Sequence, residues 1–109
     1  MPEAVIAITG ASGARYGVRL LQALCEAGWQ IRLIVTSAGA INLDLECGIS
    51  PSELASDPAV TLEENDNLAA RSASGSARFD AYVVCPASGT TIGKIATGIS
   101  DNLATRSAL

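Results

Sequence analysis

The 109-residue sequence predicts an α/β fold in which helices cover a central parallel sheet. Three short apolar runs, at residues 4–9, 30–36 and 81–85, are rich in β-branched residues, as strands buried on both faces are. Each run is followed by a segment with helical patterning. Strands that alternate with helices pair in parallel through right-handed crossovers, so the pattern indicates a Rossmann-like fold with three layers.

The first half of the chain contains two of these strand–helix units. Residues 4–9 lead into the tight turn Gly10-Ala11-Ser12-Gly13, and an apolar stripe at helical spacing predicts a helix over residues 14–27 that ends at Gly28. Residues 30–36 form the second strand. Ser37 is predicted to cap a helix that ends near Gly48.

The second half begins with a short helix that Ser50 caps and Pro51 opens. Residues 57–78 are polar and are expected to hold at most a short strand at 60–62; residues 72–76 look too small and flexible to build a core. Pro86 stops the strand at 81–85, and Ser88 is predicted to cap a helix over 89–97. Asp101 is predicted to cap a last helix that still runs at Leu109.

Composition narrows the classes of function. The net charge is −4 and no basic stripe exists, so neither a nucleic-acid footprint nor a membrane span is expected. The chain has no histidine, which excludes a Ser-His-Asp or Cys-His arrangement, and its three scattered cysteines predict a reduced, cytoplasmic protein. No signal peptide is expected from the first residues, and no metal site is expected because no ligand set is clustered.

The ends of the three strands are the expected binding site, because ligands of parallel sheets bind beyond the carboxyl ends of the strands. Residues 10–13, 36–37 and 86–91 meet there and bring hydroxyl groups and helix N-termini. Taken alone, residues 10–13 could equally be a tight turn and Ser88 an ordinary cap. The dinucleotide pattern G-x-G-x-x-G and a complete P-loop are both absent, so a mononucleotide with one phosphate is the better fit.

The same segments resemble those of the flavin prenyltransferases, formerly described as aromatic-acid decarboxylases. The resemblance rests on five segments in the family's order: residues 8–21 (ITGASGARYGVRLL), 35–38 (VTSA), 73–76 (ASGS), 85–88 (CPAS) and 98–103 (GISDNL). It implies a flavodoxin-like FMN-binding domain over residues 1–109. It also implies transfer of a dimethylallyl group from dimethylallyl phosphate to FMN, which gives the prenylated flavin that partner decarboxylases use.

The resemblance also implies site residues. FMN would be held by Gly10, Ala11, Ser12, Ser37, Ser88, Gly89, Thr90 and Thr91, with no metal. Ser12 and Glu46 would be catalytic. Glu46 resembles the glutamate that acts as acid and base near the flavin, although its spacing from Ser37 is one residue shorter than usual. The plain alternative is that Glu46 is a solvated helix residue.

Two further hypotheses remain open. Residues 86–91 (PASGTT) are similar to the same segment of flavin-dependent cysteine decarboxylases, although those enzymes usually carry a histidine that this chain lacks. The chain could also be a non-catalytic FMN-binding fragment. Members of the resembled family are nearly twice as long, so the C-terminal strands are expected to be missing, and the full-length protein is expected to be a homo-oligomer.

Overall fold

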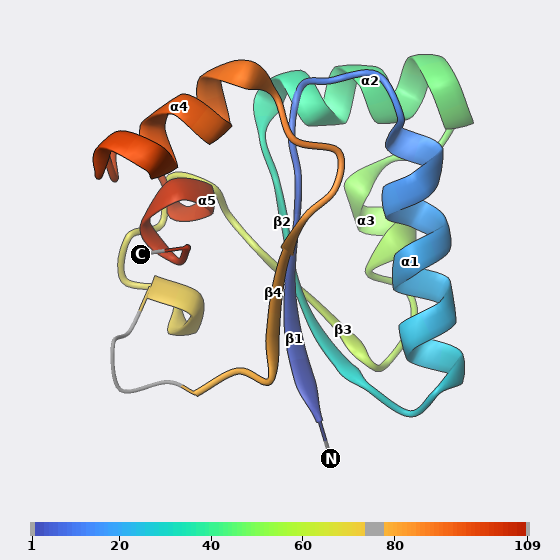
Figure 1. Ribbon diagram of the computed structural model, residues 1–109. Helices are drawn as coiled ribbons and strands as arrows, with labels where there is room; N and C mark the ends of the chain where they lie inside the picture. Colours follow the sequence, from blue (N-terminus) through green and yellow to red (C-terminus); the bar gives the residue numbers. More distant parts are fainter. Residues whose placement is uncertain (1, 74–77, 109) are drawn as a thin grey trace.

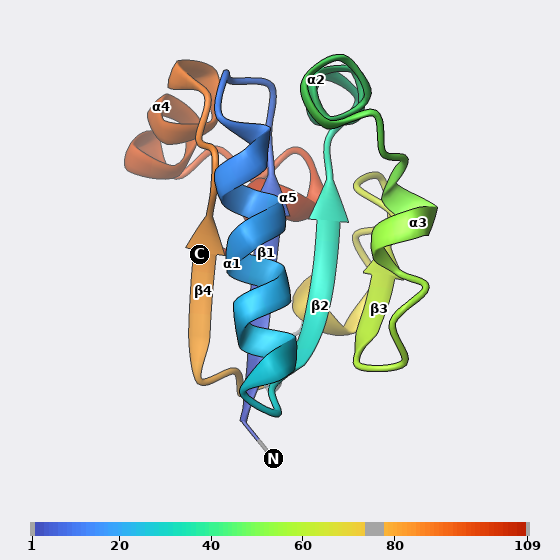
Figure 2. The same ribbon diagram turned by 90° about the vertical axis from the view of Figure 1, so that its right-hand side faces the viewer.

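The computed structural model describes residues 2–73 and 78–108 and contains one sheet of four parallel strands. The strands are β1 (Glu3–Ile8), β2 (Gln30–Val35), β3 (Val60–Glu63) and β4 (Ala81–Val84), and their spatial order is β3-β2-β1-β4. This order puts β1 at the centre of the sheet and leaves β4 at one edge (Figure 2). The predicted parallel α/β class is confirmed.

Helices cover the sheet on both faces (Figure 1). One face carries α1 (Ala14–Glu26), α2 (Ser37–Cys47) and α3 (Pro51–Leu54); the other carries the short 3₁₀ helix η1 (Arg71–Ala73) and α5 (Leu103–Arg106). The remaining helix, α4 (Gly89–Thr97), follows the edge strand β4 and packs against α5. The three predicted layers are therefore present.

The alternation of side chains along β1 explains the two cores. Residues 4–8 of β1 are completely buried; Ala4, Ile6 and Ile8 point into the layer of α1, whereas Val5 and Ala7 point toward α5. A strand that is apolar on both faces can only lie in the middle of a sheet covered by helices. β4 differs, since all four of its residues are only half-buried.

Two predicted helix caps are wrong. The cap of α2 is Thr36, whose Oγ1 accepts a hydrogen bond from the Gly39 N–H at 3.0 Å, so Ser37 is already the first helical residue. The cap of α5 is Asn102 rather than Asp101, and α5 ends at Arg106 instead of continuing to Leu109. In both helices two neighbouring residues could cap, and the sequence alone does not rank them. The predicted Ser88 cap of α4 is confirmed.

The prediction that residues 72–76 build no core is wrong for Ser72, while residues 74–77 lie outside the described part of the chain. Ser72 is buried, and its hydroxyl donates to the carboxylate of Glu63. Nearby, Arg71 donates to Glu3 at 3.2 Å, and Arg32 lies between Glu3 and Glu63. These charged groups connect the polar segment around residues 71–72 to the sheet, through contacts that cannot be predicted from the local sequence.

Candidate functional site

The three predicted turns meet at the carboxyl edge of the sheet because the two residues that follow β1 contact the segments on both sides. Gly10 packs so tightly against the start of α2 that a Cβ placed on it would lie 2.4 Å from the Cβ of Ala38. On the other side, Thr9 Oγ1 accepts a hydrogen bond from the Ser88 N–H at 2.7 Å. Consecutive residues of one turn therefore hold the N-termini of α2 and α4 on either side of it.

The N-terminus of α1 is occupied by a carboxylate from another helix. Gly13 adopts a φ of +108° before α1 and offers no side-chain cap. Instead, Glu46 Oε1 accepts hydrogen bonds from the N–H groups of Gly13 and Ala14, both at 3.0 Å. An anion is favoured at this position by the helix dipole and by the unpaired N–H groups. Glu46 is half-buried, so it is more than a solvated helix residue, and it lies beside Ser12.

The N-termini of α2 and α4 share one arrangement. In each, the first hydroxyl residue caps the helix: Thr36 accepts from Gly39, and Ser88 accepts from the Thr91 N–H at 3.1 Å. The hydroxyls of Ser37 and Thr90, one and two residues further on, belong to exposed residues. The first N–H groups of a helix have no partner within it, so both ends present hydroxyl and amide donors to an anion.

The hydroxyl groups of Ser88 and Thr91 are hydrogen-bonded to each other, which restricts their direct contact with a ligand. Besides the cap, the Ser88 hydroxyl donates to Thr91 Oγ1 at 2.8 Å, and Thr91 is buried. The ordinary cap that the sequence allowed is therefore present at Ser88. Gly89 and Thr90 are the exposed members of this turn.

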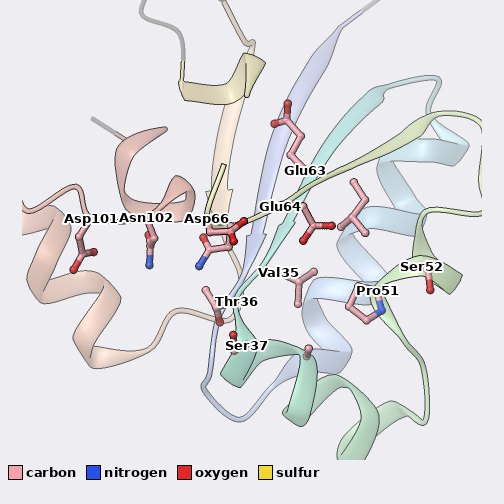
Figure 3. A pocket seen from close by; sticks show the side chains of 13 residues that line it. Val35, Thr36, Ser37, Pro51, Ser52, Glu63, Glu64, Asp66, Asp101 and Asn102 are labelled. Carbon is pink, nitrogen blue, oxygen red and sulfur yellow. The ribbon is translucent and has the colours of Figure 1, made fainter. Parts of the chain in front are cut away.

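Two cavities open at this edge. One, of about 510 Å³, lies between the ends of β2 and β3 and α5, and its lining includes Thr36, Ser37, Glu64, Asp66 and Asn102 (Figure 3). The other, of about 550 Å³, is lined by Ser12, Gly13, Arg15, Tyr16, Leu45 and Glu46. The predicted catalytic pair thus shares one cavity, whereas Ser37 opens into the other and the Ser88–Thr91 turn lines neither.

Carboxylates give the larger part of the first cavity a negative character. Asp101 is paired with Lys94 at 2.9 Å, and the hydrogen bond from Lys94 holds the pKa of Asp101 below its ordinary value. Glu63 lies 3.7 Å from Arg32. Glu64 and Asp66 line the side away from α2 (Figure 3), so a phosphate group fits better beside Ser37 than deeper in this cavity.

Sequence reasoning missed Thr9 and the partners of Glu46. The one available signal for Thr9 was its place as a polar residue that ends an otherwise apolar strand. Glu46 and the residues it contacts at the start of α1 are more than thirty residues apart in the sequence, so no local sequence pattern predicts the contact. Within residues 2–73 and 78–108, no group of three His, Cys, Asp or Glu side chains could hold a metal. In the same residues, no helix has the length and apolarity that a membrane span requires.

Comparisons with known proteins show which family the chain belongs to. The model of the family described as "Flavoprotein" matches residues 2–109. A probable UbiX-like flavin prenyltransferase of Bacillus subtilis is 39% identical over 104 residues, which cover 95% of this chain and 50% of that protein. The chain spans about half the length of the curated relatives it matches.

Solved structures give the same result. The crystal structure of AnUbiX (PadA1) in complex with FMN and dimethylallyl pyrophosphate matches with a TM-score of 0.93 and 30% identity, over 98% of this chain and 56% of that one. A dodecameric FMN-dependent UbiX-like decarboxylase from Escherichia coli O157:H7 matches with a TM-score of 0.91 and 32% identity, over 97% and 58%. The resemblance seen in the sequence motifs is confirmed, and the chain belongs to the flavoprotein family.

Proposed function

We propose that this chain is the FMN-binding part of a flavin prenyltransferase, which transfers a dimethylallyl group from dimethylallyl phosphate to FMN. The observation that carries the proposal is the geometry of the sheet edge. Two helix N-termini with exposed hydroxyls lie on either side of the turn at residues 10–13, and Ser12 and Glu46 share a cavity beside it. The proposal is supported by relatives whose names include FMN or a flavin prenyltransferase activity.

The cofactor site follows from the free donors. Ser37 and Thr90 supply hydroxyls, and the N–H groups of Ser37 and Gly89 are the first of their helices. These groups suit the phosphate of FMN, with Ser88 and Thr91 acting through the cap of α4. Gly10, Ala11 and Ser12 lie between the two helices, and in this proposal they contact the flavin ring.

The catalytic proposal concerns Ser12 and Glu46. Oε1 of Glu46 already accepts two N–H groups, so Oε2 is the oxygen left to exchange a proton. Bonding a prenyl carbon to the flavin ring requires the attacked ring carbon to lose its proton, and a positioned carboxylate can accept it. Such a base typically contributes about 10²–10⁴-fold in rate. The exposed Ser12 hydroxyl lies in the same cavity, where it can donate a hydrogen bond to the ring edge.

The expected partners are part of the same proposal. The product would pass to a decarboxylase that uses prenylated FMN, and the full-length protein would be a homo-oligomer, as the dodecameric relative is. We place the protein in the cytoplasm, supported by three cysteines that are all free thiols.

A flavin-dependent decarboxylase is the second candidate, favoured by the PASGTT segment at residues 86–91 and by the name of the Escherichia coli relative. A non-catalytic FMN-binding fragment is the third. Incubation with FMN and dimethylallyl phosphate, followed by mass spectrometry of the flavin, separates the three. The flavin gains the mass of one dimethylallyl group if the proposal is right. Release of CO₂ from a cysteine-containing peptide supports the second candidate, and FMN binding without any turnover supports the third.

The phosphate site has a separate test. Ser37→Asp places a negative charge at the α2 N-terminus and should abolish FMN binding, because the carboxylate competes with and repels the phosphate. Asp44→Asn, at the other end of α2, is the control and should bind FMN as the parent does. If the Ser37→Asp variant retains FMN, the phosphate must bind at the N-terminus of another helix.

A further inference from the structure

Thr9, the first residue after β1, makes three hydrogen bonds to the segment that follows β4. It is 1% exposed, and its hydroxyl both donates to the carbonyl of Pro86 and accepts from the Ser88 N–H, each at 2.7 Å. Its own N–H also donates to the Pro86 carbonyl, at 3.2 Å. A threonine hydroxyl has one hydrogen to donate and can accept in return, so both capacities are used here.

These contacts occur just beyond the paired residues of β1 and β4, whose register ends at Ala7 and Val84. Two backbone bonds follow the paired residues: the Cys85 N–H donates to the Ala7 carbonyl at 2.9 Å, and the Thr9 N–H donates to the Pro86 carbonyl at 3.2 Å. The Thr9 hydroxyl adds two further bonds, to residues 86 and 88, at the bend that carries the chain from β4 into α4.

The same turn is confined from the side of α1. Gly17 approaches the end of β4 so closely that a Cβ placed on it would lie 2.3 Å from the Cys85 carbonyl oxygen. α1 therefore lies against the end of β4 on one side, and Thr9 binds Ser88 on the other. Ser88 in turn caps α4 and binds Thr91, and the exposed donors of Gly89 and Thr90 lie in the chain between these two hydrogen-bonded residues.

We infer that Thr9 is a positioning residue of the flavin site: its buried hydroxyl fixes the turn at residues 86–91 relative to the turn at residues 10–13. Its backbone leads directly into Gly10, while its side chain holds Ser88. One residue therefore sets the distance between the two turns that must contact the same ligand. The inference rests on the proposed FMN site and adds to it a residue that does not touch the ligand.

The test compares Thr9→Val with Thr9→Ser in the 109-residue chain. Valine keeps the shape and removes the hydroxyl, which leaves the Ser88 N–H and the Pro86 carbonyl without that partner. We expect faster hydrogen exchange at the Ser88 amide and FMN binding weaker by about tenfold or more, which corresponds to the loss of one buried hydrogen-bonding group. Thr9→Ser restores the hydroxyl and should recover both measurements.

Ile31→Val is the matched control, since Ile31 is equally buried but lies near the amino end of β2. It should lower the melting temperature while leaving the FMN dissociation constant of the folded protein unchanged. If Thr9→Val does not fold, Thr9→Cys takes its place, because a thiol is a weaker donor and acceptor.

Three results overturn the inference: a Ser88 amide that exchanges at the parental rate in the valine variant, an unchanged FMN dissociation constant in that variant, or a serine variant that recovers neither measurement. A parent chain that binds no FMN would contradict the proposed function of this chain. In that case the Ser88 exchange rates decide the position of the turn: faster exchange in Thr9→Val supports the role of Thr9, and an unchanged rate overturns it.

Discussion

At the scale of single residues, Glu46 combines a structural contact with a place in the candidate site. Its carboxylate caps α1 from a helix more than thirty residues away, so part of its effect on any assay will come from stability. Substitutions that separate the hydrogen bond from the charge can distinguish the two roles.

We therefore expect Glu46→Ala to lower the free energy of unfolding by about 0.5–2 kcal/mol, the usual value of a lost N-terminal cap. Glu46→Gln retains an amide oxygen that can accept from Gly13 and Ala14, and should lose only the charge contribution of about 0.3–1 kcal/mol. Urea denaturation of the three proteins measures this difference. Glu53→Ala in α3, which removes an exposed capping-box carboxylate, is a control outside the site. Equal stabilities for Glu46→Ala and the parent would contradict the cap.

The residue scale also shows where sequence reasoning stopped. The sequence alone identified the hydroxyl-rich turns, because their residues lie at strand ends. It could not decide which hydroxyl caps a helix and which stays exposed, as at Thr36 and Ser37, since that depends on the backbone angles at the start of α2. Nor could it find the partners of Glu46 or Thr9, which are distant in sequence and adjacent only in the folded chain.

At the scale of elements, close packing between the β1–α1 turn and α2 makes Gly10 intolerant of a side chain. We expect Gly10→Ala to cost about 1–3 kcal/mol, the typical cost of overpacking, because its Cβ would lie 2.4 Å from that of Ala38. Gly93→Ala in the exposed middle of α4 is the matched substitution. No atom lies within 4 Å of its added Cβ, so it should stabilise the protein by about 0.5–1 kcal/mol. Opposite shifts in melting temperature are the expected result; shifts of the same sign would refute the packing argument.

The docking of α5 on β4 predicts a loss of stability at high pH. The Tyr82 hydroxyl donates to the Ala104 carbonyl and accepts from Ser107, and burial raises the pKa of Tyr82 above its ordinary value although the bond from Ser107 opposes this. The folded state thus favours the neutral phenol. Its contribution is complete below the ordinary tyrosine pKa of about 10 and is lost as the pH rises through the higher folded value.

The measurement is the free energy of unfolding between about pH 8 and 11, compared with Tyr82→Phe. The variant should be less stable at pH 8 by about 1 kcal/mol, and its disadvantage should shrink as the pH rises. Tyr16→Phe removes an exposed phenol and serves as the control. A constant difference between Tyr82→Phe and the parent across this range would be evidence against the buried phenol.

At the scale of the whole molecule, the order of strands and helices along the chain was predictable from the sequence because three of the four strands lie in short apolar runs, at residues 4–9, 30–36 and 81–85. For β3 (Val60–Glu63) the sequence predicted at most a short strand at residues 60–62, since the pattern is interrupted by polar Thr61 and Glu63. Glu63 is buried with a charged partner, Arg32, that comes from another strand. The short last helix was overestimated for a similar reason: its end depends on packing rather than on a stop signal.

The open side of the sheet leads to a prediction about the whole chain. β4 pairs with β1 on one side, and the four-strand order of the described residues places no strand on its other side. All of β4 is half-buried, and Ile92 and Ile99 on and after the neighbouring α4 are exposed. An unpaired edge beside apolar side chains is a template for association with another chain. We therefore expect the 109-residue chain to self-associate as its concentration rises.

Light scattering and sedimentation over a concentration series measure this association, and one substitution tests whether the edge of β4 causes it. The Cys85 N–H donates to Ala7, so the N–H of the preceding residue, Val84, points to the open side. Val84→Pro removes that donor and should shift the association to higher concentration, because proline blunts an edge strand. Val83→Pro removes an N–H that faces β1 and should instead destabilise the fold. A parent chain that stays monomeric throughout the series, or a Val84→Pro variant that associates as strongly as the parent, would show that the edge of β4 is not the surface through which copies meet.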